Sequence, residues 1–280
     1  MNEVGLSSAL FAAGFEPAKH LPMMVENGIA QVELSTNCFP IWSNAKQFAD
    51  LGAAIADCGI GVNSIHAPFS AELDISHPDP ARRRETLDTI RLCLDRLVDL
   101  GGRCLVVHPS SEPIEDADRP RRMEASLESL ESLESRAPAD ASVKIAIENL
   151  PRTCLVNNSR EALAFMERLD NPLFGICQDV NHANCQEDLL EATRAYAKHV
   201  CTLHISDNDG VDERHWLPGR GVIPWREWAR VLLDAGFTGP WLYETGPWPD
   251  KEGRPQDEEA LIRGTRRNAE EWFRRELSCL

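Results

Sequence analysis

Residues 174–184 read FGICQDVNHAN, a short apolar run that ends in a carboxylate and an imidazole. The apolar part predicts a buried strand over Phe174–Asp179, and the polar residues after it predict a loop. Asp179 and His182 are both good ligands for a divalent metal ion. One such pair is weak evidence for a metal site. Its weight depends on whether other strand ends supply matching ligands.

Seven further runs have the composition of short strands, and they recur along the whole chain. The interval between successive runs is always long enough to hold a helix. These runs are Glu3–Ser7, Ile29–Leu34, Gly61–His66, Arg103–His108, Val143–Glu148, Val200–His204 and Gly239–Glu244.

The segments between these runs carry helical periodicity and end at helix-breaking residues. Ser159 is a plausible N-cap of one predicted helix, and a loop is predicted over Pro247–Gln256 before the last one. The predicted helices are Ala45–Cys58, Pro80–Leu100, Ser159–Leu169, Trp225–Ala235 and Asp257–Leu277, with a charged, leucine-containing stretch over Arg119–Arg136.

Eight strands that alternate with helices, without a linker or a change of composition, are typical of a closed parallel barrel. Such barrels often fill roughly 250 residues as one domain, and this chain has 280. We therefore predict an α/β fold with a single (β/α)8 TIM-barrel domain over residues 1–280. An open doubly wound sheet is the alternative. The eight units, and the polar residues at the C-terminal ends of the runs, favour the barrel.

The chain is strongly acidic, with 45 Asp and Glu against 29 Lys and Arg and a formal net charge of −16. A field of this sign repels polyanions, so a nucleic-acid partner is not expected. The hydrophobic fraction of 42% and the charged fraction of 26% are those of an ordinary globular protein with a sizeable core.

The nine cysteines are scattered and never form a C-x-x-C pair. This usage fits free thiols in a reducing cytoplasm better than a disulfide framework. Neither a charged and apolar leader nor an apolar run of membrane-spanning length is found, so we expect neither export nor membrane insertion.

Metal-ligand or acid–base side chains stand at the ends of seven of the runs, and three more follow the seventh run. The strand-end residues are Glu33, His66, His108, Glu148, Asp179, His204 and Glu244, and the loop residues are Asp207, Glu213 and His215. Any one of them, taken alone, is more often a structural residue than a ligand. In a barrel they converge on one rim, where several carboxylates would repel each other unless a cation or protons compensated them. A metal site is the simplest interpretation of the set.

Seven short motifs, in this order, resemble the xylose isomerase-like barrels, a family of sugar and sugar-phosphate isomerases and epimerases with endonuclease IV-like relatives. The motifs are His66-Ala67-Pro68-Phe69, Val107-His108-Pro109, Ile147-Glu148-Asn149, Asp179-Val180-Asn181-His182, His204-Ile205-Ser206-Asp207, His215-Trp216-Leu217-Pro218-Gly219-Arg220-Gly221 and Tyr243-Glu244-Thr245. The resemblance implies a divalent metal held by Glu148, Asp179, His204 and Glu244, as in the ketose epimerase branch, with His182 in contact with substrate.

The endonuclease branch is the alternative that the resemblance also implies, because that branch holds three zinc ions with nine ligands. This chain offers all nine by adding His66, His108, His182, Glu213 and His215, although Glu213 stands where that branch has an aspartate. The acidic charge, Phe69 in place of a tyrosine, and the lack of a basic aromatic segment that could wedge into a duplex disfavour this function. A non-catalytic barrel that binds a sugar or a metal is the third possibility.

The resemblance implies proton transfer on a small ketose or polyol through a metal-stabilised enediolate, with Mn, Zn, Mg or Co as the metal. Glu148 and Glu244 are the predicted acid and base, one for each face of the substrate. The predicted substrate-binding residues are His182, Glu33, His66, His108, Arg220 and Trp216. Apolar walls are expected from four aromatic residues in predicted loops, Trp42, Phe69, Trp216 and Trp248.

The segment Pro218-Gly219-Arg220-Gly221 allows two interpretations. Its backbone amides lie near the region where barrels often bind a phosphate, and Arg220 would add positive charge. It is equally compatible with a tight turn before the helix at Trp225. The sequence therefore leaves a phosphorylated and a free sugar both open. A homo-oligomer would be ordinary for the family.

Overall fold

The computed structural model of the protein describes residues 2–11, 13–137, 143–246 and 257–274. Eight parallel strands form one sheet in the order β7-β6-β5-β4-β3-β2-β1-β8. They are β1 (Val4–Ser7), β2 (Gln31–Leu34), β3 (Gly61–His66), β4 (Cys104–Val107), β5 (Lys144–Glu148), β6 (Phe174–Asp179), β7 (Val200–His204) and β8 (Trp241–Tyr243).

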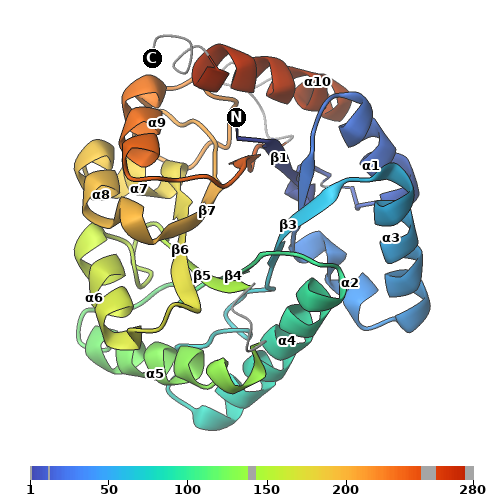
Figure 1. Cartoon of the computed structure of the whole chain (residues 1–280). Coiled ribbons are helices and arrows are strands. Elements are labelled where there is room, and N and C mark those ends of the chain that lie inside the picture. The colour runs from blue at the N-terminus through green and yellow to red at the C-terminus, as the bar shows by residue number, and fades with distance from the viewer. Residues whose placement is uncertain (1, 12, 138–142, 247–256, 275–280) are drawn as a thin grey trace.

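The two ends of this sheet meet, which closes the barrel. Ile205, directly after β7, forms a parallel bridge with Tyr243 of β8. The Ile205 N–H donates to the Leu242 carbonyl at 2.9 Å, and the Glu244 N–H donates to the Ile205 carbonyl at 3.1 Å. The predicted (β/α)8 barrel is confirmed, and the open doubly wound sheet is excluded. Figure 1 looks into the ring of strands, with the helices outside it.

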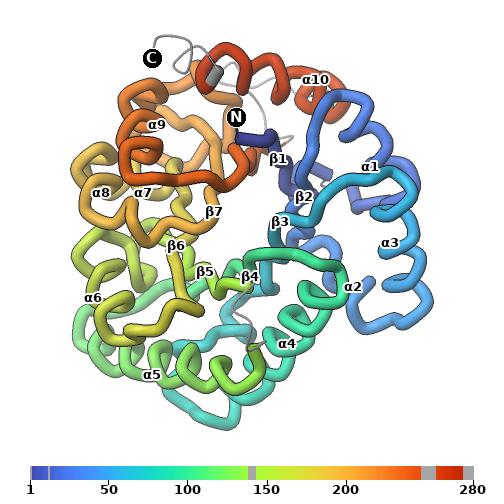
Figure 2. Tube along the Cα trace, viewed as in Figure 1, coloured from blue at the N-terminus to red at the C-terminus, as the bar shows by residue number. Residues whose placement is uncertain are grey.

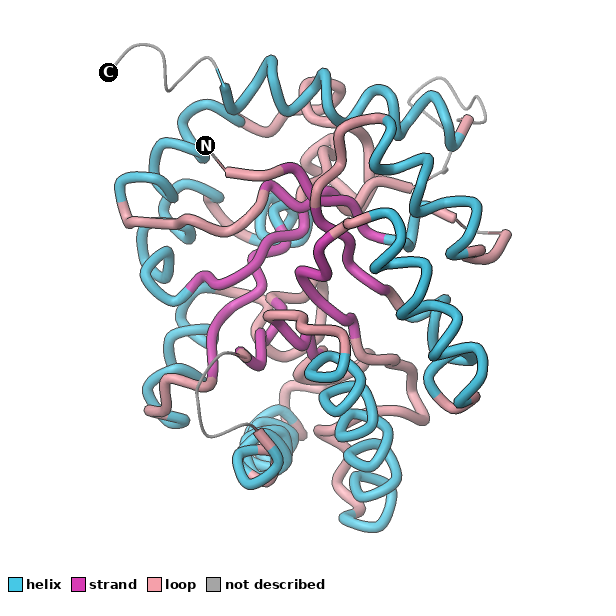
Figure 3. The backbone as a smooth tube through the Cα atoms, turned by 45° about the vertical axis from the view of Figure 1, so that its right-hand side comes forward, coloured by secondary structure: helices cyan, strands magenta, loops and turns pink. Residues whose placement is uncertain are grey.

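Helices surround the strands on the outside of the ring, as Figure 3 shows by colour. The last described helix, α10, packs beside α1, so the ring of helices is closed as well (Figure 2). The helices are α1 (Pro17–Glu26), α2 (Phe39–Trp42), α3 (Ala45–Cys58), α4 (Pro80–Asp99), α5 (Arg119–Glu131), α6 (Ser159–Leu169), α7 (Val180–Gln186), α8 (Leu189–Tyr196), α9 (Trp225–Asp234) and α10 (Glu258–Ala269).

Most helix predictions agree with the structure to within a residue or two, and the differences have local causes. The N-cap of α6 is Asn158 rather than Ser159, because the Asn158 side chain accepts the Glu161 N–H at 3.0 Å. The charged stretch after β4 divides into α5 and a short 3-10 turn, Glu134–Arg136. The last helix passes into a π-helical turn at Glu270–Arg274. The predicted loop over Pro247–Gln256 lies outside the described residues.

The residues after β6 form a helix, so the predicted loop at this point is wrong. Asp179 is the N-cap of α7, and its Oδ1 accepts the His182 N–H at 2.7 Å. An aspartate at this position satisfies one of the free amides of the first turn. The cap therefore holds the Asp179 carboxylate in one orientation at the end of its strand.

The side chains of β6 alternate between two environments, as those of a strand must. Cys177 belongs to a small cluster inside the barrel, with Cys104 and Val106 from β4 and Ala146 from β5. Gln178 is fully buried on the other side, between the strands and the helices. Its amide donates to Thr193 Oγ1 at 2.8 Å and to the Tyr196 hydroxyl at 3.2 Å, and its carbonyl accepts the indole N–H of Trp228 at 3.2 Å.

The eight cysteines within the described residues are all free thiols, as the sequence predicts, and Cys279 lies outside these residues. In the same part of the chain, the search for a membrane-crossing helix finds none of sufficient length and apolar character.

We expect Gln178→Leu to lower the free energy of unfolding by about 2–4 kcal/mol, because it leaves the buried Trp228 N–H without its acceptor. Urea denaturation would measure the change. Gln47→Leu, on the exposed side of α3, makes the same chemical change without a buried bond and should stay within about 0.5 kcal/mol of the parent protein. Equal losses in the two variants would contradict a special role for the Gln178 bonds.

Candidate active site

A cavity of about 590 Å³ opens at the C-terminal ends of the strands. This volume is in the range of pockets that hold small molecules. Most of the predicted site residues border it, although they come from strands far apart in the sequence. The polar side chains from the predicted set that line it are His66, His108, Glu148, His182, Glu213, His215 and Glu244.

Four side chains at the base of this cavity meet the requirements of a metal site. One ligand atom from each of Glu148, Asp179, His204 and Glu244 lies within 4.8 Å of the others. His204 Nδ1 is 3.2 Å from Glu148 Oε1, 3.4 Å from Glu244 Oε2 and 3.9 Å from Asp179 Oδ2. Oxygen and imidazole donors of this kind suit Mn, Zn, Mg or Co.

One oxygen of this group lacks the partner that burial requires. Asp179 Oδ2 is fully buried and has no hydrogen-bond partner among the described residues. Burial raises the pKa of Asp179 and of Glu244, and the nearby charge of Glu148 raises both further, although the neighbouring imidazoles oppose the shift. Three carboxylates at this spacing, of which Glu148 and Asp179 are buried and Glu244 is partly buried, need a cation or protons to compensate them. The residues therefore fit a divalent ion.

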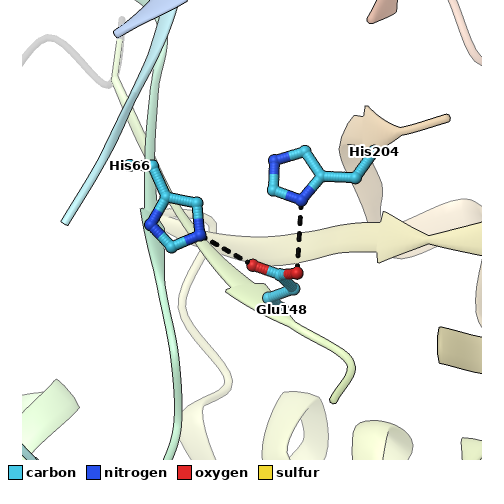
Figure 4. Close-up of side chains that lie close together, drawn as sticks. All are labelled: His66, Glu148 and His204. Carbon is cyan, nitrogen blue, oxygen red and sulfur yellow. Dashed lines mark hydrogen bonds and ion pairs between the residues drawn. The ribbon is translucent and has the colours of Figure 1, made fainter. Parts of the chain in front are cut away.

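Glu148 lies at the centre of a ring of four imidazoles. Its Oε2 is 3.1 Å from His66 Nε2 and 3.2 Å from His108 Nε2, and its Oε1 is 3.2 Å from His204 Nδ1 and 3.5 Å from His182 Nδ1. Figure 4 shows His66 and His204 on two sides of the carboxylate. Burial alone would raise the pKa of Glu148, but His204 and His108 hold it well below its usual range. This carboxylate is therefore kept charged.

Glu33 lies behind the metal-ligand group and does not border the cavity. Its Oε2 is 3.1 Å from His204 Nε2 and accepts the Ser64 hydroxyl at 2.7 Å. A carboxylate on the far nitrogen of a ligating imidazole fixes the orientation of the ring and makes it a better donor. Glu33 thus aims His204 Nδ1 at the three carboxylates, and this placement makes Glu33 a positioning residue.

A second group of polar side chains borders one wall of the cavity. Glu213 Oε2 lies between His182 Nε2 at 3.5 Å and His215 Nε2 at 3.8 Å, and Arg152 forms an ion pair with the other Glu213 oxygen. The nine side chains that resemble a three-zinc site therefore all gather around the cavity. However, none of the tight groups of potential ligands among the described residues includes His108, His182, Glu213 or His215. The spacing favours one ion over three.

The aromatic residues are placed less uniformly than the sequence predicts. Phe69 borders the cavity and stacks on His108 with ring centroids 3.7 Å apart. Trp42 is in the short helix α2 and fully buried, so its prediction as a loop residue is wrong. Trp216 and Arg220 are not among the residues that border the cavity, and Trp248 lies outside the described residues.

Several residues that border the cavity escaped the sequence analysis. Glu112 and Arg152 lie in the loops after β4 and β5, and the side chains of Asn37, Ser110 and Ser111 also border the cavity. Arg152 has a positive φ of 52°, which few side-chain-bearing residues adopt. For Arg152 the only signal in the sequence is that it follows Glu148 closely. That closeness does not show where the loop directs the Arg152 side chain.

Comparison with known proteins places the chain among barrel enzymes. The family model for the xylose isomerase-like TIM barrel matches residues 23–274. The D-psicose 3-epimerase of Ruminiclostridium cellulolyticum is 28% identical over 227 residues, covering 79% of this chain and 75% of the relative. An L-ribulose-5-phosphate 3-epimerase of Escherichia coli is 24% identical over 223 residues, covering 79% and 76%.

A solved structure has the same fold over nearly the whole length. The crystal structure of D-psicose 3-epimerase with D-tagatose, from Clostridium cellulolyticum H10, superposes with a TM-score of 0.81 at 24% identity, covering 96% of this chain and 97% of that one. The match of the family model over almost the entire barrel decides the assignment. This chain belongs to the xylose isomerase-like TIM barrel family.

Proposed function

We propose that this protein is a divalent-metal-dependent ketose epimerase, which moves a proton on the carbon beside the sugar carbonyl. The convergence of Glu148, Asp179, His204 and Glu244 within 4.8 Å at the base of a sugar-sized cavity is the observation that carries the proposal. The names of the relatives, which are sugar 3-epimerases, agree with it. The free thiols suit a cytoplasmic location, and a homo-oligomer stays a prediction.

The four residues would hold the ion through three carboxylates and His204 Nδ1. When bound, a divalent ion supplies a Lewis acid that lowers the barrier to removing a proton beside the carbonyl. Glu33 keeps the imidazole in place through the 3.1 Å contact to His204 Nε2. The N-cap bond of Asp179 and the pairing of its backbone with the Asn149 side chain hold the third carboxylate.

Glu148 and Glu244 are the proposed proton-transfer residues. They border the same cavity, but Glu148 ends β5 and Glu244 directly follows β8, three strands further around the barrel, so they would approach a bound substrate from different directions. An epimerase needs this geometry, because the proton leaves one face of the carbon and returns to the other. His182 and His108, on the cavity wall, are placed to bind hydroxyl groups of the sugar.

We expect Glu148→Gln and Glu244→Gln each to lower the rate of epimerisation about 100-fold or more, the usual contribution of one acid–base group. In each variant the remaining carboxylate still reaches one face of the substrate carbon. Each variant should therefore retain deuterium exchange from D₂O with one epimer and lose it with the other, and the two variants should retain opposite epimers. NMR of D-fructose and D-psicose incubated separately would measure this, and L-ribulose with L-xylulose is a second pair.

Glu85→Gln, on the exposed face of α4, is the matched control and should exchange like the parent protein. Loss of exchange with both epimers in a variant would show that the residue only holds the metal. Normal epimerisation in either variant would end the two-carboxylate scheme.

Chelation followed by addition of Mn²⁺, Co²⁺, Zn²⁺ or Mg²⁺ should raise the melting temperature and restore activity. At about 100 times Kd the ion adds about 2.7 kcal/mol, which corresponds to a shift of about 5 °C or more. Asp179→Asn should weaken the ion about tenfold or more, since it removes a charged ligand. Asp116→Asn, at an exposed position in the loop after β4, should leave the affinity unchanged.

Elemental analysis of the loaded protein separates the two enzyme functions that the site residues allow. We expect one ion per chain. Three zinc ions per chain, together with cleavage of a duplex that contains an abasic site, would favour the nuclease alternative that the nine gathered side chains keep open.

A further inference from the structure

The loop after β7 contains a group of backbone N–H donors, and a carboxylate of the protein itself accepts their hydrogen bonds. Asp207 is fully buried, and its Oδ2 accepts the N–H groups of Gly219 at 2.8 Å and Gly221 at 2.9 Å. The indole N–H of Trp225 donates to the same oxygen at 3.0 Å. Oδ1 accepts the N–H of Ile223 at 3.3 Å. These glycines belong to the segment that the sequence analysis interpreted either as a phosphate site or as a tight turn.

No room remains for a second anion at these amides. A side chain at position 221 would collide with the Asn208 carbonyl and with the Asp207 carboxylate, so the glycine serves the internal contact. Converging amides of this kind bind phosphate in other proteins because their dipoles attract negative charge. Here that attraction is already satisfied by Asp207.

The cavity wall shows the same pattern with a cation. Arg152 is the one Lys or Arg among the described residues that line the cavity. Its Nε lies 2.8 Å and 3.1 Å from the two carboxylate oxygens of Glu112, and its Nη1 pairs with Glu213. The three residues belong to the loops after β5, β4 and β7. The guanidinium is therefore held between two carboxylates.

The charges around the cavity oppose a phosphorylated ligand. Within the part of the chain that the structure describes, four carboxylates line it, those of Glu112, Glu148, Glu213 and Glu244. The candidate metal site, with Asp179 as its third carboxylate, would use the charge of a divalent ion, and Glu112 and Glu213 share the guanidinium of Arg152. A phosphate dianion that approached Arg152 would meet Glu112 and Glu213 at the same place, and like charges at such distances repel strongly in a partly buried site.

We infer that the site takes an unphosphorylated ketose, and that the Glu112–Arg152–Glu213 bridge is the specificity determinant that rejects the phosphate ester. The inference rests on the proposed function and names its substrate class. Both kinds of substrate occur in the names of the relatives, D-psicose in one and L-ribulose 5-phosphate in the other, so similarity alone does not choose between them.

The test compares matched pairs on the metal-loaded protein, D-fructose with D-fructose 6-phosphate and L-ribulose with L-ribulose 5-phosphate. Calorimetry measures binding, and epimer formation measures kcat/KM. We expect the free ketose of the preferred pair to bind, with a kcat/KM about tenfold or more above that of its ester. A higher affinity or kcat/KM for the ester would overturn the inference.

Glu112→Gln removes one negative charge beside Arg152 and should move the ratio of the two kcat/KM values toward the ester about fivefold, a usual size for one charge near a protein surface. Glu115→Gln makes the same change in net charge at an exposed position of the same loop and should leave the ratio unchanged. An equal shift in both variants, or none in Glu112→Gln, would overturn the role of the bridge.

The two proposals fail in different ways. If neither member of any pair is turned over, the epimerase function falls. Calorimetry of the same ligands on the parent protein and on Glu112→Gln then still shows whether the cavity binds the free ketose more tightly than the ester, and whether the Glu112 charge causes that difference.

Discussion

Mutual repulsion among closely spaced carboxylates is the constraint on which the site depends. Glu148, Asp179 and Glu244 meet at the C-terminal ends of the strands, where one oxygen of each lies within 4.8 Å of the others and of a nitrogen of His204. Such a group is unfavourable unless positive charge compensates it. The imidazoles around Glu148 supply part of that compensation, and a divalent ion is the group that the remaining unpartnered oxygen of Asp179 fits.

The surrounding structure holds these groups in place without using flexible contacts. Glu33 and Ser64 fix His204 from behind, and the first turn of α7 fixes Asp179. Glu33 on β2 reaches His204 on β7 across the inside of the barrel, whereas Asp179 is held by the residues that follow it in the chain, so closure of the barrel determines the geometry. The proposed proton transfer would need this rigidity, because small displacements of acid–base groups lower the rate sharply.

At two places the protein's own carboxylates already occupy groups that could bind an anion, one in the loop after β7 and one on the cavity wall. Asp207 occupies the amides of the loop after β7, and Glu112 and Glu213 hold Arg152. Both arrangements leave little attraction for an anionic ligand. In this chain the charges that bear on the proposed substrate preference belong to loops, whereas the candidate metal ligands stand at the strand ends.

The sequence by itself predicted the eight strands and the helices α3, α4, α6, α9 and α10, because strand and helix periodicity are local patterns. It also placed polar residues at the strand ends, and the resemblance to the family singled out four of them as expected metal ligands. Only the tertiary structure decided where each side chain points. Glu33 stands at a strand end like the ligands but lies behind His204, and Trp42 lies in a buried helix. Arg152 reaches Glu213 across two loops, and Asp207 fills the amides after it. These contacts join residues distant in sequence, and barrel closure and loop conformation, which no local pattern encodes, bring them together.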